Sequence, residues 1–212
     1  MVRRRREPEE ALGPALDGND QLARLEMFLV PEEYQEPESE IGAEADETPD
    51  SPILLVCGEH DPAADVARLA SECGFVIEVA VFESLAEDSP LAQLAGMVHV
   101  LDQEENIVSA CGVERNYYVC IFESDERLCE RLLLECLASD AAYLGVWASA
   151  AKADAIFGDL KRDGAPDAEL AAVCCPMGLG IGAVTPRQEA VAVVAELMAA
   201  KTGALKRLRY TD

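Results

Sequence analysis

The stretch ILLVCGEHDPAADVARLASECGFVIEVAVF, residues 53–82, decides the fold. It begins within an apolar run, residues 52–57, and such a run is typical of a strand that is buried on both faces. Residues 61–73 follow with helical spacing, and Gly74 is placed to end that helix. A second apolar strand, residues 75–82, completes the unit. A strand, a helix and another strand in this order predict two parallel strands joined by a crossover.

The same alternation continues along the rest of the chain. Further strands are predicted at residues 97–102, 116–124 and 142–147, and further helices at 125–139, 149–164 and 186–201. This order is typical of an α/β protein with a doubly wound, mostly parallel, Rossmann-like sheet. We expect that domain to span residues 51–203.

The first 50 residues have a different composition. Residues 30–52 are acidic and rich in proline, which predicts a disordered, self-repelling arm. One short amphipathic helix is predicted near residues 20–30, with Asp20 as its N-cap. Residues 204–212 form a short basic tail.

The formal net charge of the whole chain is −24. Such a chain gains nothing from binding nucleic acid or an anionic membrane, so we expect neither as a partner. No apolar run approaches the roughly 20 residues that span a bilayer. No apolar run follows the basic first residues either, so we expect no secretion signal and a cytoplasmic protein.

The eight cysteines occur without a CxxC pair, and the chain has only two histidines. This pattern predicts buried free thiols and no metal site.

Ligands of open parallel sheets bind beyond the carboxyl ends of the strands. The first such loop, CGEHDPA, partly fits the dinucleotide pattern G-x-G-x-x-G/A, with Gly58 and Ala63 in place. His60 stands where a glycine would let a pyrophosphate approach the backbone. The carboxylate expected at the end of the second strand is also missing, although Glu83 lies just beyond it. An oxidoreductase that uses NAD(P) is therefore a disfavoured alternative.

The later loops offer single candidates. Ser149 is predicted to cap a helix, and Lys152 either contacts an anionic ligand or is solvated. Cys174 and Cys175 are either inert thiols or, for Cys175, a soft ligand beside a metal centre. No nucleophile, acid and base can be assembled, so we expect a protein that is not an enzyme.

The segment CCPMGLGIGAVTP, residues 174–186, carries a family resemblance. It is similar to a family motif of the form PIGLDIGAxTP, and residues 143–149 are similar to YIGLIGS. On these residues the chain resembles the carboxyl-terminal domain of the XdhC/CoxF family, over about residues 52–203. Members of that family are accessory proteins for molybdenum hydroxylases such as xanthine dehydrogenase and CO dehydrogenase.

The resemblance implies that the domain binds molybdenum cofactor and delivers it to an apo molybdenum hydroxylase, alone or with a full-length XdhC-like protein. It implies cofactor contacts from Gly58, Glu59, His60, Asp61, Ser149, Lys152, Cys175, Gly178, Leu179, Gly180, Gly182 and Thr185. The glycines would either bring amides to an anionic ligand or only allow tight packing.

The chain also departs from the family pattern. His60 replaces a glycine, Gly180 an aspartate, and Ala150 and Ala151 replace arginines. We expect the acidic arm in place of the family's amino-terminal domain. An interaction module that binds no ligand, and a homodimer, therefore stay open as alternatives.

Overall fold

A computed structural model describes residues 51–86 and 88–205. The chain divides into two units, Met1–Glu47 and Thr48–Asp212, and all described residues belong to the second. The predicted arm, its short helix and most of the basic tail lie outside the described residues.

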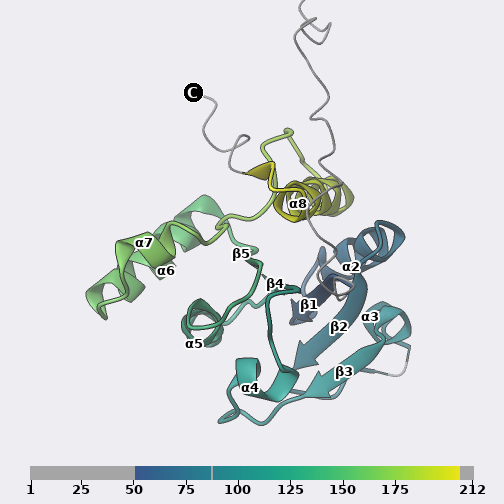
Figure 1. Cartoon of the computed structure of the whole chain (residues 1–212), viewed down its shortest axis with the longest axis horizontal. Coiled ribbons are helices and arrows are strands. Elements are labelled where there is room, and N and C mark those ends of the chain that lie inside the picture. The colour runs from purple at the N-terminus through teal and green to yellow at the C-terminus, as the bar shows by residue number, and fades with distance from the viewer. Residues whose placement is uncertain (1–50, 87, 206–212) are drawn as a thin grey trace, which may run out of the picture. The chain divides into compact units, whose positions relative to one another are not determined.

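Five parallel strands form one sheet in the order β3-β2-β1-β4-β5 (Figure 1). They are β1 (Ile53–Cys57), β2 (Val76–Val81), β3 (Met97–Val100), β4 (Tyr117–Ile121) and β5 (Tyr143–Val146). β2 and β3 lie on one side of β1, whereas β4 and β5 lie on the other. The topological switch point of the sheet is therefore between β1 and β4. The predicted doubly wound, parallel, Rossmann-like fold is confirmed.

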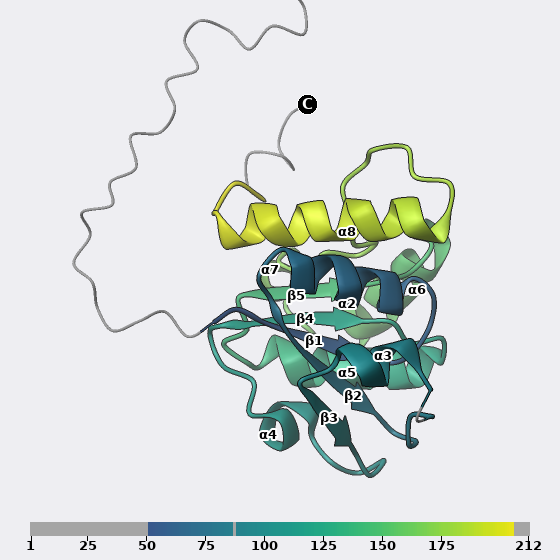
Figure 2. The same ribbon diagram turned by 90° about the vertical axis from the view of Figure 1, so that its right-hand side faces the viewer.

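Helices cover both faces of the sheet (Figure 2). One face packs against α2 (Ala63–Glu72), α3 (Pro90–Leu94) and α8 (Pro186–Lys201). The other face packs against α4 (Ile107–Cys111), α5 (Glu126–Leu137), α6 (Ala150–Arg162) and α7 (Asp167–Leu170). The four long helices were predicted. The short helices α3, α4 and α7 were not, because four or five residues are too few to show a helical period.

The apolar run of β1 is explained by this two-sided covering. Leu54 and Val56 point into the core under α2 and α8, whereas Leu55 and Cys57 point into the core under α5. All four side chains are buried. A strand with a core on each face has no polar side, which is why its sequence does not alternate.

Gly58 lets β1 end close to β4. Its φ angle is +94°, in the region that favours glycine, and a Cβ atom there would lie 2.4 Å from the carbonyl oxygen of Phe122. The glycine that the dinucleotide pattern singled out is thus required by the contact between two strand ends.

Residues after α7 close one edge of the sheet. The N–H of Cys174 donates to the carbonyl of Leu144, and Val146 N–H donates back to Cys174, both at 2.9 Å. Met177 N–H donates to Val146 at 3.0 Å. The segment between α7 and the glycine-rich loop therefore extends the sheet beyond β5.

Two carboxylates of α8 anchor this helix to β5 and its end. The buried hydroxyl of Tyr143 donates to Glu196 at 2.6 Å, and the indole N–H of Trp147 donates to Glu189 at 3.3 Å. Burial raises the pKa of Tyr143 well above its ordinary value, so its hydroxyl stays a donor. These bonds fix the helix that follows the glycine-rich loop.

Replacing Tyr143 with phenylalanine should lower the free energy of unfolding by about 1.5–3 kcal/mol, the usual range for a hydrogen bond to a carboxylate. Urea unfolding followed by circular dichroism measures this loss. Tyr118→Phe is the control, because Tyr118 is also buried in this core and its hydroxyl makes no hydrogen bond within residues 51–86 and 88–205. Equal losses in both variants would contradict the proposed anchoring.

Candidate functional site

A cavity of about 560 Å³ opens at the carboxyl edge of the sheet, near the ends of β1, β2 and β4. Its lining includes Gly58, Glu59, His60, Glu83, Gln103 and Glu123. The first three are among the predicted contact residues. Gln103 was not predicted, because it belongs to no motif and its spacing does not distinguish it from other residues after the third strand.

Two positions in the loop after β1 offer no amide to an anion. Pro62 has no N–H, and the N–H of Ala63 already donates to the carbonyl of His60 at 2.8 Å. Asp61 is exposed but does not line the cavity. Among the described residues the N–H groups of Ala64 and Asp65 donate no hydrogen bond, so the start of α2 keeps two open amides, but they follow the acidic residues Glu59 and Asp61.

In the turn after β4, a side-chain carboxylate occupies the backbone amides. Glu123 Oε1 accepts hydrogen bonds from the N–H groups of Ser124, at 2.7 Å, and Asp125, at 3.1 Å. Asp125 then caps α5 by accepting from Leu128 N–H at 2.9 Å. With Glu59, Glu83 and Glu123 around it, the cavity disfavours a phosphate-bearing nucleotide.

Lys152 is held by the same turn. Its Nζ donates to the carbonyl oxygens of Glu123, at 2.9 Å, and Ser124, at 3.0 Å. The lysine is thus neither simply solvated nor directed only at a ligand, the two interpretations that the sequence left open. Ser149 caps α6 by accepting from Lys152 N–H at 3.2 Å, as predicted.

The eight cysteines are all free, and six of them are buried. Cys73 is exposed, which corrects the expectation that every thiol is buried; it directly follows α2, where the chain turns at the surface. Cys175 is half-buried, and burial raises its pKa to about 12. Within residues 51–86 and 88–205, no group of three or more His, Cys, Asp or Glu side chains could hold a metal ion.

These environments predict one fast thiol. In folded protein at pH 8, a colorimetric disulfide reagent should modify Cys73 first, because Cys175 stays protonated until the pH approaches 12. Cys73→Ser should remove the fast phase, and Cys175→Ser should leave it unchanged. A fast phase that disappears with Cys175→Ser would show instead that this thiol is ionised.

The glycine-rich loop before α8 has two parts. Gly178, with φ +104°, packs against the helix, because a Cβ there would lie 3.4 Å from side-chain atoms of Ala192 and Val193. Leu179 N–H donates to the carbonyl of Ala192 at 3.2 Å. The positive φ of Gly178, with α8 at contact distance, thus explains the first glycine of the loop.

The second part of the loop is open. A Cβ at Gly180 or Gly182 would meet no atom within 4 Å. In the described part of the chain, the N–H groups of Gly180, Gly182 and Ala183 donate no hydrogen bond. Three amides are therefore available to an acceptor in the segment that leads into α8.

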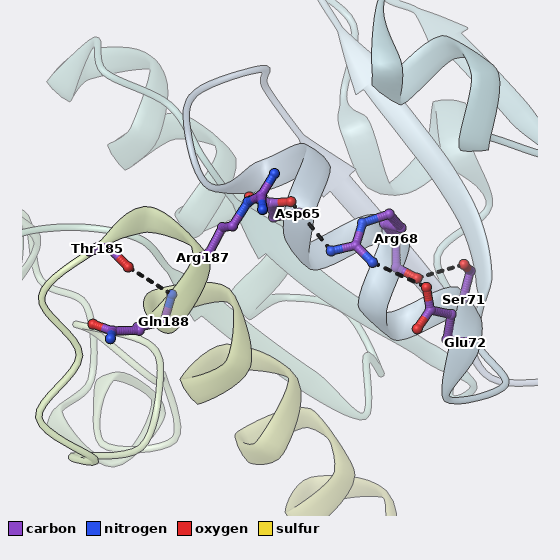
Figure 3. Close-up of polar contacts among 7 residues, drawn as sticks. All are labelled: Asp65, Arg68, Ser71, Glu72, Thr185, Arg187 and Gln188. Atoms are coloured by element: carbon purple, nitrogen blue, oxygen red, sulfur yellow. Dashed lines mark hydrogen bonds and ion pairs between the residues drawn. The ribbon is translucent and has the colours of Figure 1, made fainter.

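Capping and a cation complete this end of α8, as Figure 3 shows. Thr185 caps the helix as predicted, accepting from Gln188 N–H at 3.3 Å, and Gln188 Oε1 accepts from Val184 N–H at 2.9 Å. Arg187 is exposed and lies 3.8 Å from Asp65 of α2. A 16-residue helix begins here, so its positive dipole end adds to the charge of the arginine.

Eight of the twelve predicted contact residues fall into two groups, whereas Asp61, Ser149, Lys152 and Cys175 belong to neither. Gly58, Glu59 and His60 line the acidic cavity, and residues 178–185 form the loop before α8. In the described part of the chain, the four most prominent cavities do not combine the two groups. In residues 51–86 and 88–205, no helix has the length and apolarity needed to cross a bilayer.

Comparison with known proteins completes this description. No curated protein matches the chain. The fold is similar to the crystal structure of a xanthine dehydrogenase from Bacillus halodurans, with a TM-score of 0.61 and 20% sequence identity. The similarity covers 72% of this chain and 43% of that one, so the chain spans less than half the length of that protein. A family model described as the XdhC Rossmann domain matches residues 54–197. Because that match covers more than half of the sequence, the chain belongs to the XdhC Rossmann-domain family.

Proposed function

We propose that this protein is an accessory factor for a molybdenum hydroxylase and that it binds molybdenum cofactor at the loop before α8. The observation that carries the proposal is the set of open amides at Gly180, Gly182 and Ala183, within the segment that resembles the family motif. The cofactor is an anionic pterin, and the chemistry of this loop suits an anion.

Three features support binding at the loop. The three unbonded amides of residues 180–183 precede a helix N-terminus, a position at which backbone N–H groups bind anions. The first turn of α8 adds the positive end of the helix dipole, which stabilises an anion by about 0.3–1 kcal/mol at an exposed position. Arg187, the second residue of that helix, adds a positive charge that is partly offset by its ion pair with Asp65 over 3.8 Å.

The acidic cavity is the weaker candidate for the same ligand. The carboxylate of Glu123 occupies the amides of Ser124 and Asp125, and the carbonyl of His60 occupies that of Ala63. Glu59 and Glu83 add further negative charge to its lining. The same features argue against the alternative of an oxidoreductase that uses NAD(P).

In this proposal, Gly178 and Leu179 fix the loop against α8, and Gly180, Gly182 and Thr185 surround the anion. The bound cofactor would supply the redox-active molybdenum centre to the client. The chain's own residues would hold and protect it until an apo molybdenum hydroxylase in the cytoplasm receives it.

A loading experiment tests the site. Cofactor released from a purified molybdoenzyme is mixed with the full chain, and the protein fraction from gel filtration is oxidised and assayed for fluorescent pterin. We expect about one pterin per chain for the wild type and for Glu83→Gln, a change in the acidic cavity. Retention that depends on Glu83, or micromolar NAD(P) binding by calorimetry without pterin retention, would contradict the proposal.

A further inference from the structure

A cavity of about 1000 Å³ opens at the amino ends of β1, β4 and β5. In Figure 2 the starts of β1 and β4 and the end of α8 lie together on the left. The 16 residues of α8 span about 24 Å, so this cavity lies a helix length away from the loop at the start of α8. Its lining includes Pro52, Val113, Arg115, Asn116, Tyr118 and Lys201.

Tyr118 of β4 brings an unpaired hydroxyl to this cavity. The residue is only 8% exposed, and its hydroxyl makes no hydrogen bond within residues 51–86 and 88–205. In the same part of the chain, the fully enclosed side-chain atoms that lack a partner both belong to Arg131, so the Tyr118 hydroxyl is not sealed off from the cavity. Burial raises the pKa of Tyr118 above its ordinary value, so the hydroxyl stays a donor. A buried donor of this kind requires an acceptor from outside the protein.

Lys201 adds a cation to the same place. Its Nζ lies 5.3 Å from the centroid of the Phe75 ring, and the ring of Tyr118 packs edge-on against that ring at 5.1 Å. Among the described residues, no carboxylate forms an ion pair with Lys201. A lysine in the last turn also stabilises the helix dipole, but that role does not account for the unpaired hydroxyl beside it.

The other lining residues limit the charge of a ligand and offer it apolar surface. Asp140 lies 3.9 Å from Arg115, so these two charges offset each other. Glu114 is exposed, and water weakens its effect on a charge held beside the buried Tyr118. Pro52 is half-buried and Val113 is buried, and both present apolar atoms. The cavity therefore combines two free donors with an apolar wall.

We propose that this cavity binds a small organic carboxylate with an apolar body. The carboxylate accepts hydrogen bonds from the Tyr118 hydroxyl and from Lys201 Nζ, and the apolar body packs against Pro52 and Val113. A single negative charge suits the lining better than a phosphate, because the two acidic side chains oppose a second charge. A volume of about 1000 Å³ is at the upper end of the range for small-molecule sites.

The probe 2-naphthoate tests the proposal on the full chain. In an NMR titration it should shift the amide signals of residues 113–118, and the uncharged 2-naphthamide should bind at least about tenfold more weakly, a difference of about 1.4 kcal/mol. Tyr118→Phe should weaken naphthoate binding about tenfold without loss of folding, because it removes only a hydroxyl that has no partner in the described residues. Lys201→Gln should do the same. Lys161→Gln is the matched control, since Lys161 also lies in the last turn of its helix, α6, but outside the cavity.

Four results would overturn the proposal: no binding of naphthoate, equal binding of naphthamide, full affinity in Tyr118→Phe, or equal losses in Lys161→Gln and Lys201→Gln. The site is independent of the cofactor loop, so Tyr118→Phe should leave pterin retention unchanged. Loss of pterin in this variant would contradict a separate site, whereas absence of pterin from the wild type would leave the naphthoate result untouched. The two proposals can therefore fail separately.

Discussion

Replacing Gly58 with alanine should lower the free energy of unfolding by about 2–5 kcal/mol. Two costs add up at this position. A left-handed backbone costs a residue with a side chain about 1–2 kcal/mol. Forcing apart the closely packed ends of β1 and β4 costs about 1–3 kcal/mol more, because the new Cβ would lie 2.4 Å from the carbonyl oxygen of Phe122. Chemical denaturation of the full chain measures the loss.

Gly74→Ala is the matched control for this change. Gly74 also has a positive φ, +85°, but a Cβ there would meet no atom within 4 Å. This variant should lose only the backbone cost of about 1–2 kcal/mol. Similar losses in both variants would show that the contact with Phe122 does not determine the need for glycine after β1.

Reversing the charge of Arg187 should reduce pterin retention about tenfold or more while leaving stability nearly unchanged. The side chain of Arg187 is 86% exposed, and its ion pair with Asp65 spans 3.8 Å, so Arg187→Glu disturbs little packing. Surface changes of this kind alter stability by about 0.5 kcal/mol or less. At the start of α8, however, the change replaces a positive charge with a carboxylate that repels an anionic ligand, and a tenfold loss corresponds to about 1.4 kcal/mol.

Arg115→Glu provides the comparison for Arg187→Glu. Arg115 is 89% exposed, and its ion pair with Asp140 spans 3.9 Å. It lies just before the amino end of β4, whereas α8 begins after the carboxyl ends of the strands. The change in net charge is identical in the two variants, so a general effect of charge would reduce retention equally. A loss confined to Arg187→Glu would locate the anion at the start of α8.

Much of the fold could be predicted from local sequence signals. The glycine after α2 has one dominant local cause, the left-handed backbone at the end of that helix, and the structure confirms it. Ser149 and Thr185 cap their helices for the same local reason: their oxygens accept from amides three residues ahead. Predictions of this kind succeed because the deciding contacts lie within a few residues of one another.

The site could not be predicted to the same degree, because its chemistry depends on contacts between distant elements. Lys152 is directed by carbonyls of a turn that lies 28 and 29 residues earlier. Glu196 could be recognised as a buried acceptor only once Tyr143 was placed beside it. Gly58, in the dinucleotide-like loop, matches a motif, but the structure explains it by its close approach to Phe122. That contact could not be recognised from the sequence motif.

The most direct test of cofactor binding uses protein as the cell makes it. The full chain is purified from cells that synthesise molybdenum cofactor, oxidised, and assayed for fluorescent pterin per mole of protein. Our account predicts near-stoichiometric pterin in the wild type and a loss of about tenfold or more in Arg187→Glu. Well-folded wild-type protein that carries no pterin would contradict it.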